Sequence, residues 1–146
     1  MKETIDDFHA NGYDFLSNFF QYQVRYECIL YPSSEHAFQA AKTLDIKVRK
    51  LFTIEGMTPA QAKTLGREIK CRSDWDAVKL SVMDDILAAK FSDLSLKRLL
   101  IDTGDAELIE GNTWNDTFWG VCNGKGSNFL GKALMNLRKN LTTPAA

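Results

Sequence analysis

Apolar residues recur along much of this chain with the period of an α-helix. One such stretch predicts a long helix that is capped by Ser73 or Asp74 and runs to about Phe91. The same period predicts a helix over 94–101 and a closing amphipathic helix over 129–141. The pattern therefore places most of the second half of the chain in helices.

Helix-start residues predict two further helices. The run Thr-Pro-Ala-Gln at 58–61 offers a capping Thr, a Pro at the first helical position and a Gln three residues after the cap. This helix is expected to run to about Gly66, because glycine commonly follows the last turn of a helix. A short helix is predicted over 45–52.

Extended structure is predicted in two places. Residues 21–30 alternate loosely between apolar and polar, which indicates one or two short strands able to pair as a hairpin, and 107–110 indicates a short extended piece. The sequence thus predicts an α+β fold, predominantly helical, with a small β element near the N-terminus. A single domain is expected over 1–141, followed by a disordered tail over 142–146.

Length and charge narrow the class of protein. The 146 residues suffice for one domain with a full core, and the 45% hydrophobic and 25% charged residues are typical of a globular protein. A formal net charge of -1 gives no general attraction to nucleic acid or to anionic membranes. No apolar run approaches a membrane span, and the polar N-terminal segment is unlike a signal peptide. We therefore expect a cytoplasmic protein that does not act at a membrane.

Cysteine and histidine usage gives no signature of a disulfide or a metal site. Cys28, Cys71 and Cys122 are far apart and odd in number, which indicates reduced thiols. The two histidines have no cysteine cluster beside them, so a structural zinc site is not expected. The sequence predicts neither a metal nor a cofactor.

The segment 31–42 predicts a helix with an unusual face. Ser33 or Ser34 can cap it, which places Glu35 in the first turn, where the helix dipole favours a negative charge. The helical period then aligns one carboxylate, one aromatic ring, one amide and one cation: Glu35, Phe38, Gln39 and Lys42. Such a face suits polar groups presented inside a pocket. The alternative is a surface helix with Phe38 as its single apolar anchor.

The segment 110–131 is rich in Gly, Asn and Trp. Ordering such a loop costs much conformational entropy, and function is a common reason for keeping one. Its aromatic rings beside Glu110 and Asp116 suit a flat heterocycle attached to a sugar. The alternative is a packed Ω-loop. The Asn-Gly-Lys-Gly-Ser run at 123–127 lacks the P-loop spacing, although a backbone nest for an anion stays open.

A cluster of cations lies between the predicted helices. Arg67, Lys70 and Arg72, together with Lys42, can hold a phosphate, and a solvated basic surface is the alternative. Cys71 lies among these cations, but no histidine lies near it in the sequence to activate it as a nucleophile.

These residues together resemble the NADAR family, the YbiA-like N-glycosidases, over nearly the whole chain and in the same order. The segments that carry the resemblance are 16–19 (Leu-Ser-Asn-Phe), 31–42 (Tyr-Pro-Ser-Ser-Glu-His-Ala-Phe-Gln-Ala-Ala-Lys), 62–67 (Ala-Lys-Thr-Leu-Gly-Arg), 72–75 (Arg-Ser-Asp-Trp), 115–120 (Asn-Asp-Thr-Phe-Trp-Gly) and 126–131 (Gly-Ser-Asn-Phe-Leu-Gly). Two departures put the substrate in question: Tyr26-Glu27 replaces an expected Asp-Gly turn, and the loop after Glu110 differs in length.

The resemblance implies cleavage of an N-glycosidic bond at ribose C1. One branch of the family hydrolyses phosphorylated ribosyl intermediates of riboflavin biosynthesis. Other members are associated with NAD and ADP-ribose, and some remove ADP-ribose from guanine in nucleic acid. The implied substrate is thus a phosphorylated ribosyl or ADP-ribosyl small molecule, or an ADP-ribosylated nucleic acid. A module that binds ADP-ribose or another NAD-derived nucleotide without cleaving it is the alternative function.

The resemblance also implies the site residues. Two are implied to be catalytic: Glu35 and Asp116. The residues implied to bind substrate are Asn18, Phe19, Lys42, Arg67, Arg72, Trp75, Trp119 and Gly120.

The chemistry of the bond fits these residue types. Breaking a ribose C1–N bond builds positive charge at C1, which a nearby carboxylate stabilises while it orients the attacking water. We expect Glu35 in that role. Asp116 would hold water or ribose hydroxyls, or protonate the leaving base. The tryptophans would stack on the base or ribose, and Lys42 and Arg67 would hold the phosphate.

Overall fold

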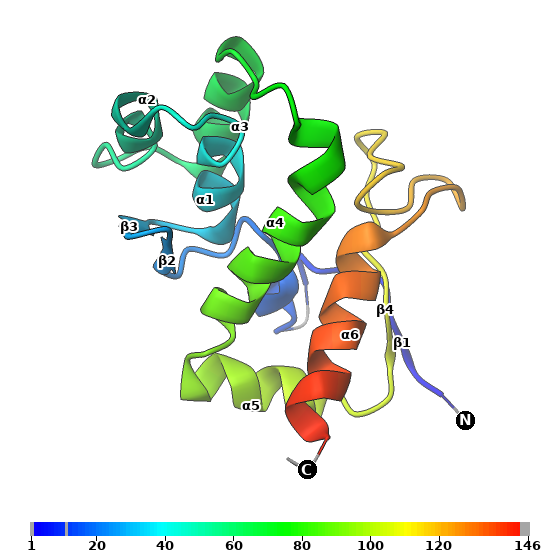
Figure 1. The fold of residues 1–146 in the computed structure, drawn as a ribbon. Helices are drawn as coiled ribbons and strands as arrows, with labels where there is room; N and C mark the ends of the chain where they lie inside the picture. The colour runs from blue at the N-terminus through cyan, green and yellow to red at the C-terminus, as the bar shows by residue number, and fades with distance from the viewer. Residues whose placement is uncertain (1, 11, 144–146) are drawn as a thin grey trace. The chain divides into compact units, whose positions relative to one another are not determined.

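The computed structural model describes residues 2–10 and 12–143, and the chain forms two compact units (Figure 1). The central unit consists of residues 18–90, and the terminal unit combines residues 1–17 with 91–146. Helices dominate both units and the strands are short, so the predicted α+β class is confirmed. In the described part of the chain, no helix combines the length and the apolar character that crossing a bilayer requires.

A β-hairpin opens the central unit. Strand β2 (Val24–Tyr26) pairs with β3 (Ile29–Tyr31) in antiparallel register, with Val24 opposite Tyr31, which confirms the predicted hairpin. Glu27 and Cys28 form the connection with φ values of 45° and 72°. Two positive φ angles match the tight turn that fits the twist of a hairpin, although Asn and Gly usually occupy it.

Four helices follow in the central unit. They are α1 (Ser34–Ala40), α2 (Ile46–Leu51), α3 (Pro59–Glu68) and α4 (Trp75–Lys90). Ser33 caps α1 by accepting a hydrogen bond from the His36 N–H, and Asp45 caps α2 in the same way. Thr58 and Gln61 form the predicted capping box at α3. Local side-chain chemistry therefore starts these three helices where the sequence predicts.

Helix α1 is buried along its whole length. All of its seven residues are buried, because α2, α3, α4 and both strands of the hairpin pack around it. The alternative of a surface helix with Phe38 as its single anchor is therefore wrong. The polar residues of α1 lie inside the protein, where each needs a partner.

Helix α3 corrects the expectation that Gly66 ends it. The helix continues to Glu68, and Gly66 lies buried in its last turns. A Cβ atom at this position would overlap the side chain of Gln39 on α1. Gly66 thus provides room for a neighbouring helix and does not terminate its own.

The terminal unit joins both ends of the chain. Strand β1 (Thr4–Ile5) pairs in parallel with β4 (Glu107–Leu108), and a 3-10 turn, η1, covers Asp14–Leu16. Helix α5 (Leu94–Asp102) precedes β4, and α6 (Phe129–Thr142) packs against both α5 and β4 (Figure 1). Strand β1 was not predicted, because two residues are too short to show a period.

Buried Arg138 links α6 to the turn before β4. Its Nη1 donates to the Thr103 hydroxyl and its Nη2 to the carbonyl of Ala106, both at 2.8 Å. Helix α6 includes Thr142, which the sequence assigns to the tail. Residues 144–146 of that tail lie outside the described residues.

Candidate active site

The central unit holds a carboxylate buried at the start of α1. Glu35 is 7% exposed, and its Oε1 accepts a hydrogen bond from Nε2 of Gln39 at 2.9 Å. Its backbone N–H donates to the carbonyl of Asn18 at 3.0 Å. The first turn of a helix suits a negative charge, so the fold holds Glu35 in place electrostatically as well as by these bonds.

Asn18 secures this helix start. Its Oδ1 accepts from the Ser34 hydroxyl at 2.9 Å, and its Nδ2 donates weakly to the sulfur of Met83 at 3.6 Å. Asn18 is 8% exposed, whereas the adjacent Phe19 is 38% exposed. These bonds give Asn18 a structural task beside Glu35, and substrate binding by Asn18 and Phe19 stays a prediction.

A cation cluster lies beside Glu35. Burial lowers the pKa of Lys42, and Arg67 and Lys63 on α3 lower it further, whereas Glu35 and Cys71 act in the opposite direction. These interactions indicate that Lys42, which follows α1 directly, lies close to Glu35 of α1 and to the cations of α3. Lys63 and Arg67 are one helical turn apart, so both lie on the same face of α3. The structure thus brings together Glu35, Lys42 and Arg67 as predicted, and adds Lys63.

Two aromatic rings lie in the same unit. Phe38 of α1 and Trp75 of α4 have ring centroids 5.1 Å apart at an angle of 56°. Phe38 is buried and Trp75 is partly exposed. Trp75 therefore has a ring face fixed by the core, as a stacking residue requires.

Arg72 is engaged by a neighbouring carboxylate. Its Nε lies 2.6 Å from Oδ1 of Asp74, and its Nη2 donates to Oδ2 at 3.0 Å. This bidentate pair raises the pKa of Arg72 and lowers the pKa of Asp74. The Arg72 N–H donates to the carbonyl of Lys42, which ties this segment to the end of α1. A role for the Arg72 guanidinium in substrate binding stays a prediction.

His36 and Cys71 do not form a nucleophilic pair. The ring of His36 is bonded through Nδ1 to the Ser33 hydroxyl at 2.7 Å and through Nε2 to the carbonyl of Met57 at 2.9 Å. Cys71 is exposed beside Lys42. His36 therefore supports the cap of α1.

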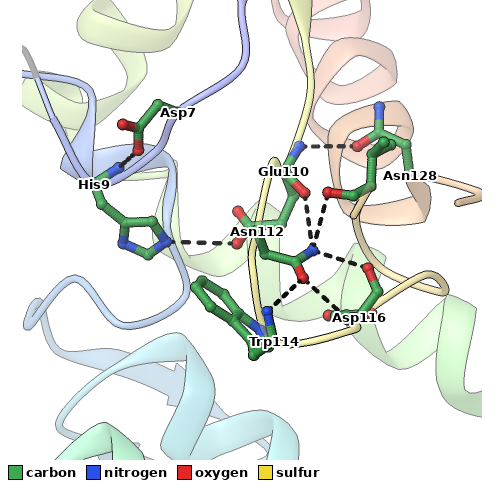
Figure 2. Close-up of polar contacts among 8 residues, drawn as sticks. Asp7, His9, Glu110, Asn112, Trp114, Asp116 and Asn128 are labelled. Carbon is green, nitrogen blue, oxygen red and sulfur yellow. Dashed lines mark hydrogen bonds and ion pairs between the residues drawn. The ribbon is translucent and has the colours of Figure 1, made fainter. Parts of the chain in front are cut away.

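The loop of the terminal unit is organised by Asn112, a residue for which the sequence predicts no role (Figure 2). Its Nδ2 donates to the carbonyl of Asp116 at 2.8 Å, and its Oδ1 accepts the N–H groups of Trp114 and Asp116 at 3.2 and 3.0 Å. Asparagine commonly closes loops through such backbone bonds, so its place in an Asn-rich loop was the available signal.

Asp116 holds the next part of this loop. Its Oδ1 accepts the N–H of Phe118 at 3.1 Å and the N–H of Trp119 at 2.9 Å. The ring of Trp119 meets that of Phe118 edge to face, with centroids 4.9 Å apart. The carboxylate thus sets the backbone that carries Trp119. The catalytic role of Asp116 and substrate binding by Trp119 stay predictions.

Buried Glu110 begins the loop and faces His9. Its Oε1 lies 3.8 Å from Nε2 of His9, whose ring meets Trp114 edge to face (Figure 2). Gly120 packs so tightly against the Glu110 carbonyl that a Cβ atom there would collide with it. Substrate binding by Gly120 stays a prediction, and its packing alone accounts for the glycine.

The Asn-Gly-Lys-Gly-Ser run forms a tight turn. Asn123 and Gly124 both have positive φ, and the Cys122 N–H donates to the carbonyl of Lys125 at 2.9 Å. This turn differs from a phosphate-binding P-loop. Among the described residues, no group of three or more His, Cys, Asp or Glu side chains could hold a metal ion.

The chain is similar to known proteins over nearly its whole length. The NADAR domain model matches residues 7–142. The N-glycosidase YbiA of Shigella boydii is 40% identical over 147 residues, which cover 97% of this chain and 91% of that protein. A riboflavin biosynthesis protein of Vibrio vulnificus is 36% identical over 134 residues, 89% of this chain and 36% of that protein. The NMR structure of YbiA from E. coli has a TM-score of 0.83 at 38% identity, covering 97% of this chain and 86% of that one.

Proposed function

The chain belongs to the NADAR family, and from this premise we propose that it hydrolyses the bond between C1 of a phosphorylated ribose and the nitrogen of a base. Its relatives are named N-glycosidases, so the chain is a hydrolase of N-glycosyl bonds. The choice of a phosphorylated ribosylaminopyrimidine as substrate is supported by the relative named for riboflavin biosynthesis. ADP-ribosyl compounds, including ADP-ribosylated guanine, form the second substrate class.

One observation carries the assignment of Glu35 as the catalytic carboxylate. It is buried at a helix start, one turn from Gln39, in the unit that also holds the cations Lys42 and Arg67. A buried carboxylate facing a cation cluster fits a substrate that carries a phosphate at one end and develops positive charge at C1.

The reaction then assigns a task to each group. Water adds its hydroxyl group to C1, and its one remaining proton is taken up by Glu35 and then passed to the departing nitrogen. Glu35 stabilises the positive charge at C1 and accepts the single proton that the attacking water loses. Lys42 and Arg67 bind the phosphate, and this remote binding energy fixes C1 against the carboxylate. Trp75 stacks on the base or ribose.

The test is product release with a matched pair of variants. The purified protein is incubated with a ribosylaminopyrimidine phosphate, NAD, ADP-ribose and an ADP-ribosylated guanine oligonucleotide, and products are separated by chromatography. Glu35→Gln is expected to lower the rate on the preferred substrate about 10³-fold, as for other general bases. The control is Glu55→Gln, because Glu55 is exposed in a turn, and it should retain full activity.

Each outcome decides a separate point. The substrate that yields free base names the branch of the family. Near-normal turnover by Glu35→Gln would remove Glu35 from the chemistry. Saturable binding of ADP-ribose without cleavage of any substrate would instead favour the binding module.

A further inference from the structure

Gln39 holds the Glu35 carboxylate from one turn further along α1. The bond from Gln39 Nε2 to Glu35 Oε1 is 2.9 Å long, and the two residues are 5% and 7% exposed. An ionised carboxylate can only accept hydrogen bonds, so the amide must turn its NH₂ group towards Glu35. The Gln39 carbonyl oxygen, Oε1, then faces away from the carboxylate.

Gly66 of α3 provides the space for that carbonyl oxygen. A Cβ atom at Gly66 would overlap Oε1 and would lie 2.7 Å from Cδ of Gln39. Gly66 lies inside a helix, where glycine lowers helix stability relative to alanine. Because the backbone at Gly66 is helical, the conformational freedom of glycine is not needed there. What the structure requires at this position is the lack of a side chain. Gly66 thus fixes the amide of Gln39 from the opposite side.

The Gln39 carbonyl oxygen is buried at a cost. Among the residues that the structure describes, none donates a hydrogen bond to it. Burying an acceptor without a donor lowers stability, as does the glycine in α3. Both costs are explained if the contact between Gln39 and Glu35 serves the chemistry, because sites are commonly kept at the expense of stability.

We propose that Gln39 is a positioning residue for Glu35, and that Gly66 locks the Gln39 amide in the orientation this role requires. The inference rests on the proposed function, in which Glu35 acts at C1. A bond to Oε1 fixes the rotation of the carboxylate and so aims Oε2 at the water. The same bond favours the ionised form of the carboxylate.

Charged groups near Glu35 interact with it separately from the Gln39 bond. Lys42 favours its ionised form, and Lys63, Arg67 and Cys71 act on Lys42. On α1 itself, His36 is bonded to Ser33 and Met57. On α4, Trp75 contacts Phe38 and Met83 contacts Asn18, and both residues are uncharged. Tyr31 of the hairpin interacts with Arg49 of α2 and with Glu27. The Gln39 bond can therefore be removed without removing a charge.

Two variants remove the bond from opposite helices. Gln39→Met keeps the length of the side chain but has no donor, and Gly66→Ala displaces the amide while it improves helix propensity. Gln21→Met is the matched control, because Gln21 is exposed. The pKa of Glu35 is followed by the ¹³C NMR shift of its labelled carboxyl group, and kcat by product release across pH.

The expected results concern Glu35 and not folding. Both variants should raise the pKa of Glu35 by about one unit, and the fall of kcat on acidification should begin at a correspondingly higher pH. At pH values above this acidic fall, kcat of both variants should be about tenfold lower than that of the parent chain, with KM unchanged. The reason is that the bond aims the carboxylate in the transition state. Gln21→Met should match the parent chain in both measurements.

The NMR titration separates this inference from the proposed function. An unchanged pKa of Glu35 in folded Gln39→Met or Gly66→Ala protein would overturn the positioning role, even where Glu35→Gln is inactive. A raised pKa together with an active Glu35→Gln variant would show that Gln39 holds Glu35 but that Glu35 is not catalytic, which would also overturn the positioning role. A raised pKa with an inactive Glu35→Gln variant supports both.

Discussion

Replacing Asp116 separates two tasks that its carboxylate can have. The structure shows Oδ1 accepting the N–H groups of Phe118 and Trp119 at 3.1 and 2.9 Å. Asparagine keeps a carbonyl oxygen in that position but carries no charge, whereas alanine removes the acceptor. Comparing Asp116→Asn with Asp116→Ala therefore distinguishes holding the loop from chemistry that needs the negative charge.

The magnitude follows from the two hydrogen bonds. A bond to a charged group contributes about 1.5–3 kcal/mol when buried, and for the partly exposed Asp116 we discount this to about 1 kcal/mol for each bond. Asp116→Ala should thus lower the free energy of unfolding by about 2 kcal/mol, and Asp116→Asn by about 0.5 kcal/mol. At about 3 °C per kcal/mol for a chain of this size, Tm should fall by about 6 °C and about 2 °C.

The assay combines thermal unfolding with kcat and KM on the preferred substrate. If Asp116 only holds the loop, Asp116→Asn should keep most of the activity, and Asp116→Ala should lose activity together with stability. A stable Asp116→Asn variant that has lost activity as completely as Glu35→Gln would refute the structural explanation. Asp116 would then be a second catalytic carboxylate. Equal losses of stability in the two variants would show that the Oδ1 bonds contribute little.

Two further predictions concern stability. Burial lowers the pKa of His36 below its usual 6.5, so the folded protein resists a proton that the unfolded chain accepts. The free energy of unfolding in urea should therefore fall as pH drops below about 6.5, and His36→Gln should weaken that dependence; a pH profile identical in both proteins would contradict it. Gly120→Ala should lower the free energy of unfolding by about 2–3 kcal/mol, because its Cβ would strike the backbone carbonyl of Glu110. A variant that unfolds at the same denaturant concentration as the parent chain would disprove this.

Local signals predicted the helices well. The capping box at Thr58 lies where the sequence predicts, because capping depends on residues within one turn. The short helix predicted over 45–52 is present as α2, which Asp45 caps. The extension of α3 past Gly66 could not be predicted, since the reason is a side chain on another helix. Strand β1 was missed for a similar reason, because its pairing partner β4 lies about a hundred residues away in the sequence.

The contacts among the predicted site residues could be foreseen only in part. The helical period correctly placed Glu35 beside Gln39 on α1. Lys42 lies just beyond the end of this helix, yet its charge still interacts with Glu35. The sequence could not show that Asp74 forms an ion pair with the Arg72 guanidinium. Either side chain could equally have faced a ligand. Pairing between charges depends on rotamers and on competing partners, which the spacing of residues does not determine.

Helix α1 shows why this site resists prediction from periodicity alone. A helix buried on all sides is ordinarily apolar all round, yet α1 carries Ser34, Glu35, His36 and Gln39. The structure compensates each with a local bond, to Asn18, to Met57 or within the helix itself. Since these bonds hold both the fold and the carboxylate, substitutions in α1 that break them should change stability and activity together. Gln39→Met is expected to separate the two, because it keeps the packing and removes only the donor to Glu35.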